Sequence, residues 1–482
     1  KGTDQTFSLT VSSSADNFDI TAGDDLLRIR NGTLILKGNI NLNSVHGGGN
    51  WDVGFDQNTN GAFIIDGATV DMTNSNALVV YGLFQLKSGS ITIGDQGMVN
   101  REDGEIEING GTMGVSKYRV SNSSLNHRGS FTMTGGTMNI DEALGQSVDD
   151  QAAFAMPFSG QSLTITGGTI NVKYAESTGI AENGGIQIAV DPSNANISGG
   201  TWNITTKSPD ASTSFGIASS VPFWNMNVKS AGGTGGGEAI IMDLKAKVDG
   251  TTFTVFAEDL EILNDFSMES TDSPEFNANG FNATIKNNFT INSGAVFENT
   301  GTTNTVNFNQ VSTQFITLNN AVTFDNLNIA TGDTAFFSGS NNPVISDTLT
   351  LTGSNVAELD NINLLAEGNI ANSGSFITPN SGEVRMQATT ASQEILGDGN
   401  GIFENLILDN TNGTAGSVQV TMSANQRITS TLTLNQDRLF DIGASRLTLS
   451  GTASLDAGGG AFGAGRMIIT NGVASDLGIR KE

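Results

Sequence analysis

The chain of 482 residues has no cysteine, only 7 prolines and few positive charges. The lack of cysteine excludes disulfide bonds, cysteine-ligated metals and thiol catalysis. Lys and Arg number 22 against 49 Asp and Glu, which gives a formal net charge of −27. Nucleic acids and anionic membranes attract basic surfaces, so we expect no nucleic-acid partner.

Long hydrophobic runs are also missing. No stretch of 18 apolar residues occurs in the sequence, so we expect no transmembrane helix. The chain opens with Lys1-Gly-Thr-Asp-Gln and shows no signal peptide at this point. We therefore expect that, if the protein is exported, residue 1 follows a leader that was removed or left out.

Polar aromatic residues are scarce, with 3 Tyr and 3 Trp against 26 Phe. Phe is wholly apolar and suits an interior stack, whereas Tyr and Trp favour binding surfaces because each has a polar tip. Charged residues make up only 15% of the chain and Gly reaches 60 residues. A surface covered largely by Asn, Thr, Ser and Gly is common in exported β proteins, so we expect an extracellular or cell-surface location.

A repeated phrase dominates the first half of the chain: an apolar-alternating run, a Gly-Gly-Thr turn and a second such run. Full copies are INGGTMGV (108–115), MTGGTMNI (133–140), ITGGTINV (165–172) and ISGGTWNI (197–204). They recur at short, similar intervals, as stacked solenoid turns do. One copy cannot bury its apolar face alone, so neighbours must stack. The sequence predicts an all-β fold, a right-handed parallel β-helix or related β-solenoid with little or no helix.

Alternation within the copy at 131–140 predicts which side chains point inward. The inward set is Phe131, Met133, Met138 and Ile140, and the outward set is Thr132, Thr134, Thr137 and Asn139. In-register stacking aligns Asn139, Asn171 and Asn203 in one outward ladder. A threonine ladder beside it contains Thr112, Thr137, Thr169 and Thr201. We interpret both ladders as structural, with a sugar-binding face as the alternative.

A glycine-rich break at 230–237 divides the predicted β-helix into two parts. Residues 1–235 carry the Gly-Gly-Thr turns and inserted loops, and residues 236–482 continue the β-helix with a different repeat. There, the phrase from Phe324 to Ile329 recurs from Phe403 to Leu408, and Thr348-Leu-Thr-Leu351 recurs as Thr431-Leu-Thr-Leu434. An offset of about 80 residues is longer than one solenoid turn, so it predicts Phe-x-Asn-Leu repeat units of several turns each.

The C-terminal phrases carry a resemblance. The segments TFDNLNI, IFENLILDNTNG, TSTLTLNQ and GRMIITNGVASDLGIRKE resemble repeats of very large Bacteroidota surface proteins, including gliding-motility adhesins and other exports of the type 9 secretion system. The resemblance covers roughly residues 285–482. It implies an extracellular stalk or adhesin segment, with the outer-membrane secretion machinery and a surface polysaccharide or other adhesion target as partners. No sorting domain follows Glu482, so we expect a longer protein.

Catalysis is the alternative class of function, because parallel β-helices host many polysaccharide lyases and hydrolases. A lyase needs a cation to stabilise an enolate and a base to take the α-proton. Lys117, Tyr118, Arg119 and His127 supply these residue types, in a stretch that reads as an irregular loop between two turns. An inserted loop with ion pairs is the other interpretation. Paired carboxylates do not recur at the repeat period, so we predict no enzyme activity.

Two further features are candidate binding sites. Asp56, Asn58 and Asn60 have the spacing of the first oxygen ligands of a calcium loop, which makes calcium a possible cofactor. Gly67 occupies the position of the expected bidentate Glu, so an ordinary turn is the alternative. Trp51 and Trp224 lie in loop-like segments and are candidate ligand contacts. Capping of the solenoid end is the alternative.

Overall fold

The computed structural model shows a β-solenoid of parallel strands, and it describes most of the chain. The described residues are 6–11, 17–20, 25–29, 32–38, 40–44, 50–54, 61–73, 75–94, 96–120, 128–141, 152–173, 185–206, 215–230, 238–241, 243–249, 252–256, 258–270, 273–298, 303–412, 418–435, 439–450, 454–456, 467–470 and 479–481. Helical structure in these ranges is limited to one 3₁₀ turn, η2 (Pro192–Asn194). The all-β prediction is confirmed.

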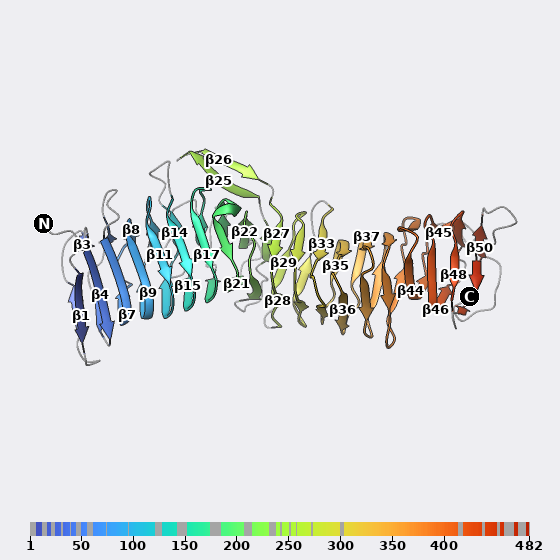
Figure 1. The fold of residues 1–482 in the computed structure, drawn as a ribbon, viewed down its shortest axis with the longest axis horizontal. Coiled ribbons are helices and arrows are strands. Elements are labelled where there is room, and N and C mark those ends of the chain that lie inside the picture. Colours follow the sequence, from blue (N-terminus) through green and yellow to red (C-terminus); the bar gives the residue numbers. More distant parts are fainter. Residues whose placement is uncertain are drawn as a thin grey trace. The chain divides into compact units, whose positions relative to one another are not determined.

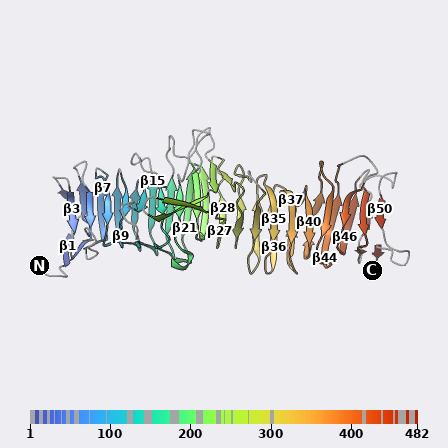
Figure 2. The same ribbon diagram turned by 90° about the horizontal axis from the view of Figure 1, so that it is seen from above.

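The chain forms two compact units. Unit 1 comprises Lys1–Ile262 and Thr271–Glu275, and unit 2 comprises Leu263–Ser270 and Phe276–Glu482. Both differ in extent from the predicted parts 1–235 and 236–482. Within each unit the strands of successive turns lie side by side in both views (Figures 1 and 2).

Unit 1 winds around three faces. Its first face contains β1 (Thr6–Val11), β4 (Gly32–Gly38), the first parts of β7 (Gly61–Met72) and β9 (Leu83–Ile93), β11 (Glu105–Ile108), β14 (Ser130–Met133), β17 (Ser162–Ile165) and β20 (Ala195–Ile197). Its second face contains β2 (Asn17–Ile20), β5 (Asn41–Ser44), the second parts of β7 and β9, β12 (Thr112–Val115), β15 (Thr137–Asp141), β18 (Thr169–Lys173), β21 (Thr201–Thr206) and β23 (Asn225–Ser230). Its third face contains β3 (Asp25–Ile29), β6 (Asn50–Val53), β8 (Leu78–Val80), β10 (Met98–Asn100), β13 (Tyr118–Val120), β16 (Phe154–Met156), β19 (Ile186–Ile188), β22 (Phe215–Ser219) and β24 (Glu238–Ile241).

The predicted alternation is confirmed in β14 and β15. The side chains of Phe131, Met133, Met138 and Ile140 are buried, whereas Thr132, Thr137 and Asn139 are half-buried and Thr134 is exposed. Gly-Gly-Thr makes the corner between the first and second faces. The second glycine has a left-handed backbone, with φ of 82° at Gly168, where an added Cβ would lie 2.9 Å from the main-chain oxygen of Gly135. Glycine is therefore required there by both conformation and space.

Several strands of the third face of unit 1 are buried on both sides, as Val79 in β8 and Val99 in β10 show, whereas Arg119 in β13 is half-buried. An antiparallel hairpin of β25 (Leu244–Asp249) and β26 (Thr252–Phe256) lies outside the stacked turns (Figure 1). Its Leu244 packs against Ala189 and Ala218 at β19 and β22. Unit 1 also contains β27 (Leu260–Ile262), whose Ile262 forms a parallel bridge with Phe223.

Unit 2 also has three faces. Face A contains β30 (Ala283–Ile285), β33 (Thr305–Phe308), the second parts of β35 (Thr323–Ile329) and β37 (Val344–Leu351), β40 (Asn369–Asn372), β43 (Gln393–Leu396), β45 (Val418–Met422), β47 (Leu439–Gly443) and β50 (Met467–Thr470). Face B contains β28 (Phe266–Met268), β31 (Phe289–Ile291), β34 (Gln314–Leu318), β36 (Thr334–Gly339), β38 (Val356–Leu359), β41 (Ser375–Ile377), the first parts of β44 (Gly401–Leu408) and β46 (Gln426–Leu434), β48 (Leu447–Leu449) and β51 (Ile479–Lys481). Face C contains β29 (Glu275–Asn277), β32 (Val296–Glu298), the first parts of β35 and β37, β39 (Asn363–Ala366), β42 (Glu383–Met386), the second parts of β44 and β46, and β49 (Ser454–Asp456).

The Phe-x-Asn-Leu phrase forms a corner without ending the strand. The register shifts between Phe324 and Asn326 in β35, and between Phe403 and Asn405 in β44. The first phrase turns from face C to face A, and the second turns from face B to face C. The recurring phrase therefore specifies a bend, and its two copies lie on different faces.

Aromatic rings fill the interior of both units, but with different side chains. In unit 1, Phe154 lies 4.8 Å from Tyr118 and 5.1 Å from Trp202 between ring centroids. In unit 2, Phe289 lies 5.4 Å from Phe266 and 5.3 Å from Phe308. Every ring pair described in unit 2 consists of Phe alone.

Candidate functional site

The predicted catalytic cluster does not form one surface site. Tyr118 lies in β13, a regular strand of the third face, so the expectation of an irregular loop is wrong at this residue. Its ring is fully buried, and its hydroxyl accepts a hydrogen bond from Asn100 Nδ2 at 3.5 Å. Burial raises the pKa of Tyr118 well above its ordinary value, although the Asn100 bond partly opposes this. A protonated phenol inside the core cannot reach a substrate as a base.

The two residues that flank Tyr118 in the sequence differ in burial. The Lys117 side chain is buried, with 3% exposure. Arg119 Nη2 donates to Gln96 Oε1 at 3.2 Å, and burial together with the charge of Arg101 lowers the pKa of Arg119. His127 lies outside the described residues. Because Lys117 and Tyr118 are both buried, they do not form a solvent-facing pair that a substrate could reach.

The candidate ligand contacts also lie mostly away from solvent. Trp51 lies in β6 rather than in a loop, is 1% exposed and packs 6.1 Å from the ring of Phe63. That loop expectation is wrong, and the Trp51 side chain offers no surface to a ligand. Trp224 is half-buried between β22 and β23. The calcium candidates Asp56, Asn58 and Asn60 lie outside the described residues, and no group of three His, Asp or Glu able to hold a metal occurs within them.

The outward polar ladder predicted in unit 1 is confirmed and lines a shallow groove of about 320 Å³. Asn171 Nδ2 donates to Asn139 Oδ1 at 2.7 Å, and Asn203 Nδ2 donates to Asn171 Oδ1 at 2.7 Å. Asn227 continues the ladder, with a bond of 3.3 Å to Asn203 Oδ1. The remaining lining residues are Ile140, Asp141, Lys173, Thr205 and Lys229. Here the asparagines bond mainly to one another, and the groove carries charges.

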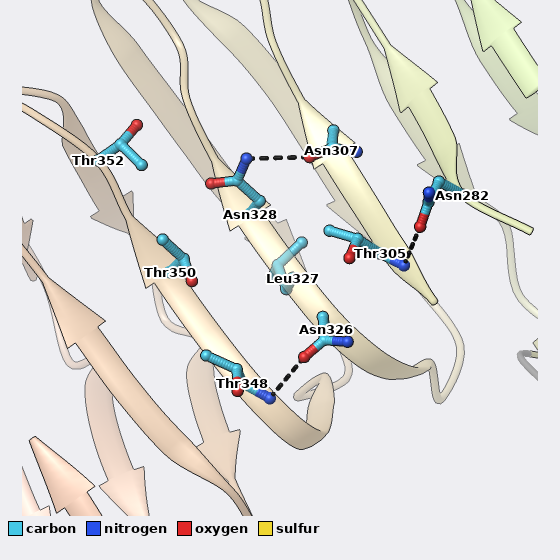
Figure 3. Close-up of a pocket in the computed structure, with 9 residues that line it drawn as sticks. All are labelled: Asn282, Thr305, Asn307, Asn326, Leu327, Asn328, Thr348, Thr350 and Thr352. Atoms are coloured by element: carbon cyan, nitrogen blue, oxygen red, sulfur yellow. Dashed lines mark hydrogen bonds between the residues drawn. The ribbon is translucent and has the colours of Figure 1, made fainter. Parts of the chain in front are cut away.

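A second groove, of about 600 Å³, lies on face A of unit 2 (Figure 3). Its lining residues are Asn282, Thr305, Asn307, Asn326, Leu327, Asn328, Thr348, Thr350 and Thr352. They come from β33, β35 and β37, from Asn282 directly before β30, and from Thr352 directly after β37. None of these side chains is charged, and all except Leu327 are asparagine or threonine. The three strands pair in register, so the groove presents a regular polar surface.

In one column of groove residues, the asparagine side chains form hydrogen bonds with main-chain groups. Asn282 Oδ1 accepts the Thr305 main-chain N–H at 2.8 Å, and Asn326 Oδ1 accepts the Thr348 N–H at 3.1 Å (Figure 3). Asn326 Nδ2 also donates to Asn304 O at 2.9 Å. These amides satisfy main-chain groups at corners where the strand ladder is interrupted. They hold successive turns in fixed register and thereby position the groove.

In the neighbouring column of groove residues, the asparagine ladder stops after two residues. Asn328 Nδ2 donates to Asn307 Oδ1 at 2.9 Å, as in the ladder of unit 1. The next turn places Thr350 opposite Asn328, where a further asparagine would continue the ladder. Asn328 Oδ1 is buried and has no hydrogen-bond partner among the described residues. Figure 3 shows this oxygen on the side of Asn328 that faces β37.

No known protein family, curated protein or solved structure matches this chain. Within the described ranges, no helix has the length and apolar character needed to cross a membrane. A function for this chain is therefore inferred from the residues and geometry of the solenoid itself.

Sequence reasoning missed the groove of unit 2, although its phrases were recognised. The signal was the period-2 polar positions within them: Asn307 in β33, Asn328 in β35 and Thr350 in β37. Their alignment depends on the number of residues in each single turn. The repeat unit recognised in the sequence spans several turns, so it does not give that number.

Proposed function

We propose that this chain is a structural and adhesive segment of an extracellular surface protein, a rigid β-solenoid stalk exported by a type 9-like route. The observation that carries the proposal is the uncharged ladder of Asn and Thr on the outward faces, held in register by side-chain bonds between turns. Such a surface presents the same groups repeatedly. Repeated weak contacts add up through multivalency, which adhesion requires.

Rigidity is supported by the way the turns are joined. Each turn contacts its neighbours through parallel strands, and amide ladders such as Asn139–Asn171–Asn203 add side-chain bonds along the stack. In repeat architectures of this kind, contacts are limited to neighbouring repeats, so added turns extend the structure without changing its cross-section. A projecting stalk needs this property.

The uncharged groove of unit 2 favours binding over catalysis. A polysaccharide lyase or hydrolase needs a base or a pair of carboxylates at the reacting bond. No such group lines the groove, and the buried Tyr118 is unsuited to the task. Binding without chemistry is the simpler use of such a surface.

The proposal is tested on intact cells that produce the full-length protein. We expect an externally added protease to remove the epitope of this chain, and a strain lacking the type 9 machinery to retain it inside. A strain in which this segment alone is deleted should attach less to polysaccharide-coated surfaces. An epitope that stays protected in intact wild-type cells would contradict the proposal.

A further inference from the structure

We propose that the groove of unit 2 binds a neutral, hydroxyl-rich polysaccharide chain laid along its stacked turns. This inference rests on the proposed adhesive function and names the ligand class. It starts from unused hydrogen-bonding groups at one place. Asn328 Oδ1 is buried without a partner, and the Thr348 and Thr350 hydroxyls make no side-chain hydrogen bond among the described residues.

These groups match the chemistry of a sugar. A sugar hydroxyl donates and accepts at the same time, so it can donate to Asn328 Oδ1 and accept from a threonine hydroxyl. Each threonine also presents a methyl group, which suits the C–H surface of a sugar ring. A buried acceptor without a partner is unfavourable, so a ligand donor that reaches Asn328 Oδ1 relieves a cost that the free protein carries.

Charge and main-chain pairing narrow the ligand further. The groove has no charged side chain, and the net charge of −27 opposes a polyanion. A polypeptide that docks by strand addition needs an open sheet edge. The strands of this groove pair with neighbours on both sides: β35 lies between β33 and β37, and β37 pairs onward with β40. The remaining mode of binding is recognition of ligand hydroxyl groups by the side chains of the groove.

Repetition favours a polymer over a single small molecule. Asn307, Asn328 and Thr350 occupy equivalent positions on three successive turns, separated by the spacing of hydrogen-bonded strands, about 4.8 Å. Thr305, Asn326 and Thr348 form a parallel column beside them. A chain of linked sugars presents its hydroxyls at regular intervals and can contact several turns at once.

The test measures binding of the full chain to soluble polysaccharides by affinity electrophoresis in native gels. The neutral probes are laminarin, galactomannan, dextran and hydroxyethyl cellulose, and alginate is the polyanionic comparison. The decisive variant is Thr348→Val with Thr350→Val, which keeps the side-chain shape and breaks no side-chain bond described within the protein. Asn328→Val removes the acceptor. Asn171→Val, in the ladder of unit 1, is the matched control.

We expect at least one neutral polysaccharide to retard the chain. The double threonine variant should weaken that binding by about tenfold, which corresponds to about 1.4 kcal/mol. Asn328→Val should weaken it as well, and Asn171→Val should leave it within about twofold of the native value. Circular dichroism confirms folding of each variant, and the double threonine variant decides if Asn328→Val does not fold.

Three results would overturn the inference: no retardation by any neutral probe, retardation unchanged in the double threonine variant, or equal retardation by alginate. This test is separate from that of the proposed function. A chain that is exposed on cells but binds no neutral polysaccharide leaves the stalk standing without this groove. A chain that binds through the groove but stays protected inside cells contradicts the stalk alone.

Discussion

The two units carry the same kind of asparagine ladder, but the ladders end differently. In unit 1, asparagines occupy four successive turns and bond to one another. In unit 2, Asn307 and Asn328 form one such bond before Thr350 interrupts the column. The same side chain therefore stabilises the stack where the ladder continues and leaves a buried acceptor without a partner among the described residues where it stops.

The aromatic side chains in the interiors of the two units also differ. Among the described rings, those of unit 2 are all Phe, whereas unit 1 places Tyr118 and Trp202 in its core. A Phe core contains no group that titrates, while a buried phenol does. Tyr118 in unit 1 and Phe289 in unit 2 are both fully buried, but the two units should respond differently to alkaline pH. Four experiments test these differences.

The largest effect should come from the aromatic cores, where the two units should behave alike. Trp202→Ala in unit 1 and Phe289→Ala in unit 2 each remove a buried ring that contacts rings of neighbouring turns. We expect each to lower the free energy of unfolding by about 3–5 kcal/mol, measured by chemical denaturation. A loss below about 1 kcal/mol in either unit would show that its core is not closely packed.

The next largest difference in stability between the units should come from substitutions of corner glycines. Gly168 in unit 1 and Gly353 in unit 2 both have positive φ, of 82° and 63°. An added Cβ at Gly168 would lie 2.6 Å from Met133 Cε and 2.9 Å from Gly135 O, whereas nothing lies within 4 Å at Gly353. We expect Gly168→Ala to cost about 3 kcal/mol and Gly353→Ala about 1 kcal/mol. Equal losses in denaturation would mean that the close approach at Gly168 is relieved.

Alkaline pH should weaken unit 1 through Tyr118. Burial raises the folded-state pKa of this phenol above its ordinary value of about 10. Below pH 10 or so, both states hold the proton, and the contribution of the buried phenol to stability is complete. Above it, the unfolded chain releases the proton while the folded chain keeps it, so the free energy of unfolding falls by about 1.4 kcal/mol per pH unit.

The control for this pH effect is Tyr118→Phe. Comparison of the native chain and this variant at pH values of about 9 and 11 isolates the phenol from lysines, which titrate in the same range. The native chain should lose more stability between the two pH values than the variant does. Identical losses would show that the phenol ionises in the folded protein with its ordinary pKa.

The smallest effect should distinguish the two ladders. Asn171 is bonded on both sides, to Asn139 and Asn203, so Asn171→Val breaks two side-chain bonds and should cost about 1 kcal/mol. Thr350→Val breaks none that is described and should change the free energy of unfolding by less than about 0.5 kcal/mol. Thermal and chemical denaturation measure both. A clear loss for Thr350→Val would indicate that its hydroxyl has a structural partner.

Much of the fold could be predicted from sequence because alternation and in-register repetition are local signals. The inward set around Phe131 and the ladder from Asn139 to Asn203 followed from period 2 and a repeated phrase. Trp51 and Tyr118 were misplaced because their strands are only 4 and 3 residues long, and the strand of Trp51 is buried on both sides. Strands this short carry too little alternation to be told from loops in sequence.

The candidate site was harder to predict, because it depends on alignment between turns. The phrases at Phe324 and Phe403 are alike, yet they lie on different faces. The number of residues in the connections between them decides on which face each phrase lies. A polar side chain in a strand reveals that it points outward. It does not reveal which residue of the next turn lies opposite.

The amino-acid sequence alone predicted that this protein stacks parallel strands around an apolar interior, because one copy of an amphipathic phrase cannot bury its apolar face without neighbouring copies. It also determined the outward ladders of unit 1, where consecutive copies repeat the same residue. The position of Thr350 opposite Asn328, which leaves Asn328 Oδ1 without a partner among the described residues, became visible in the fold alone. That outcome depends on the lengths of the turns between the strands, which decide which residues of neighbouring turns come into contact.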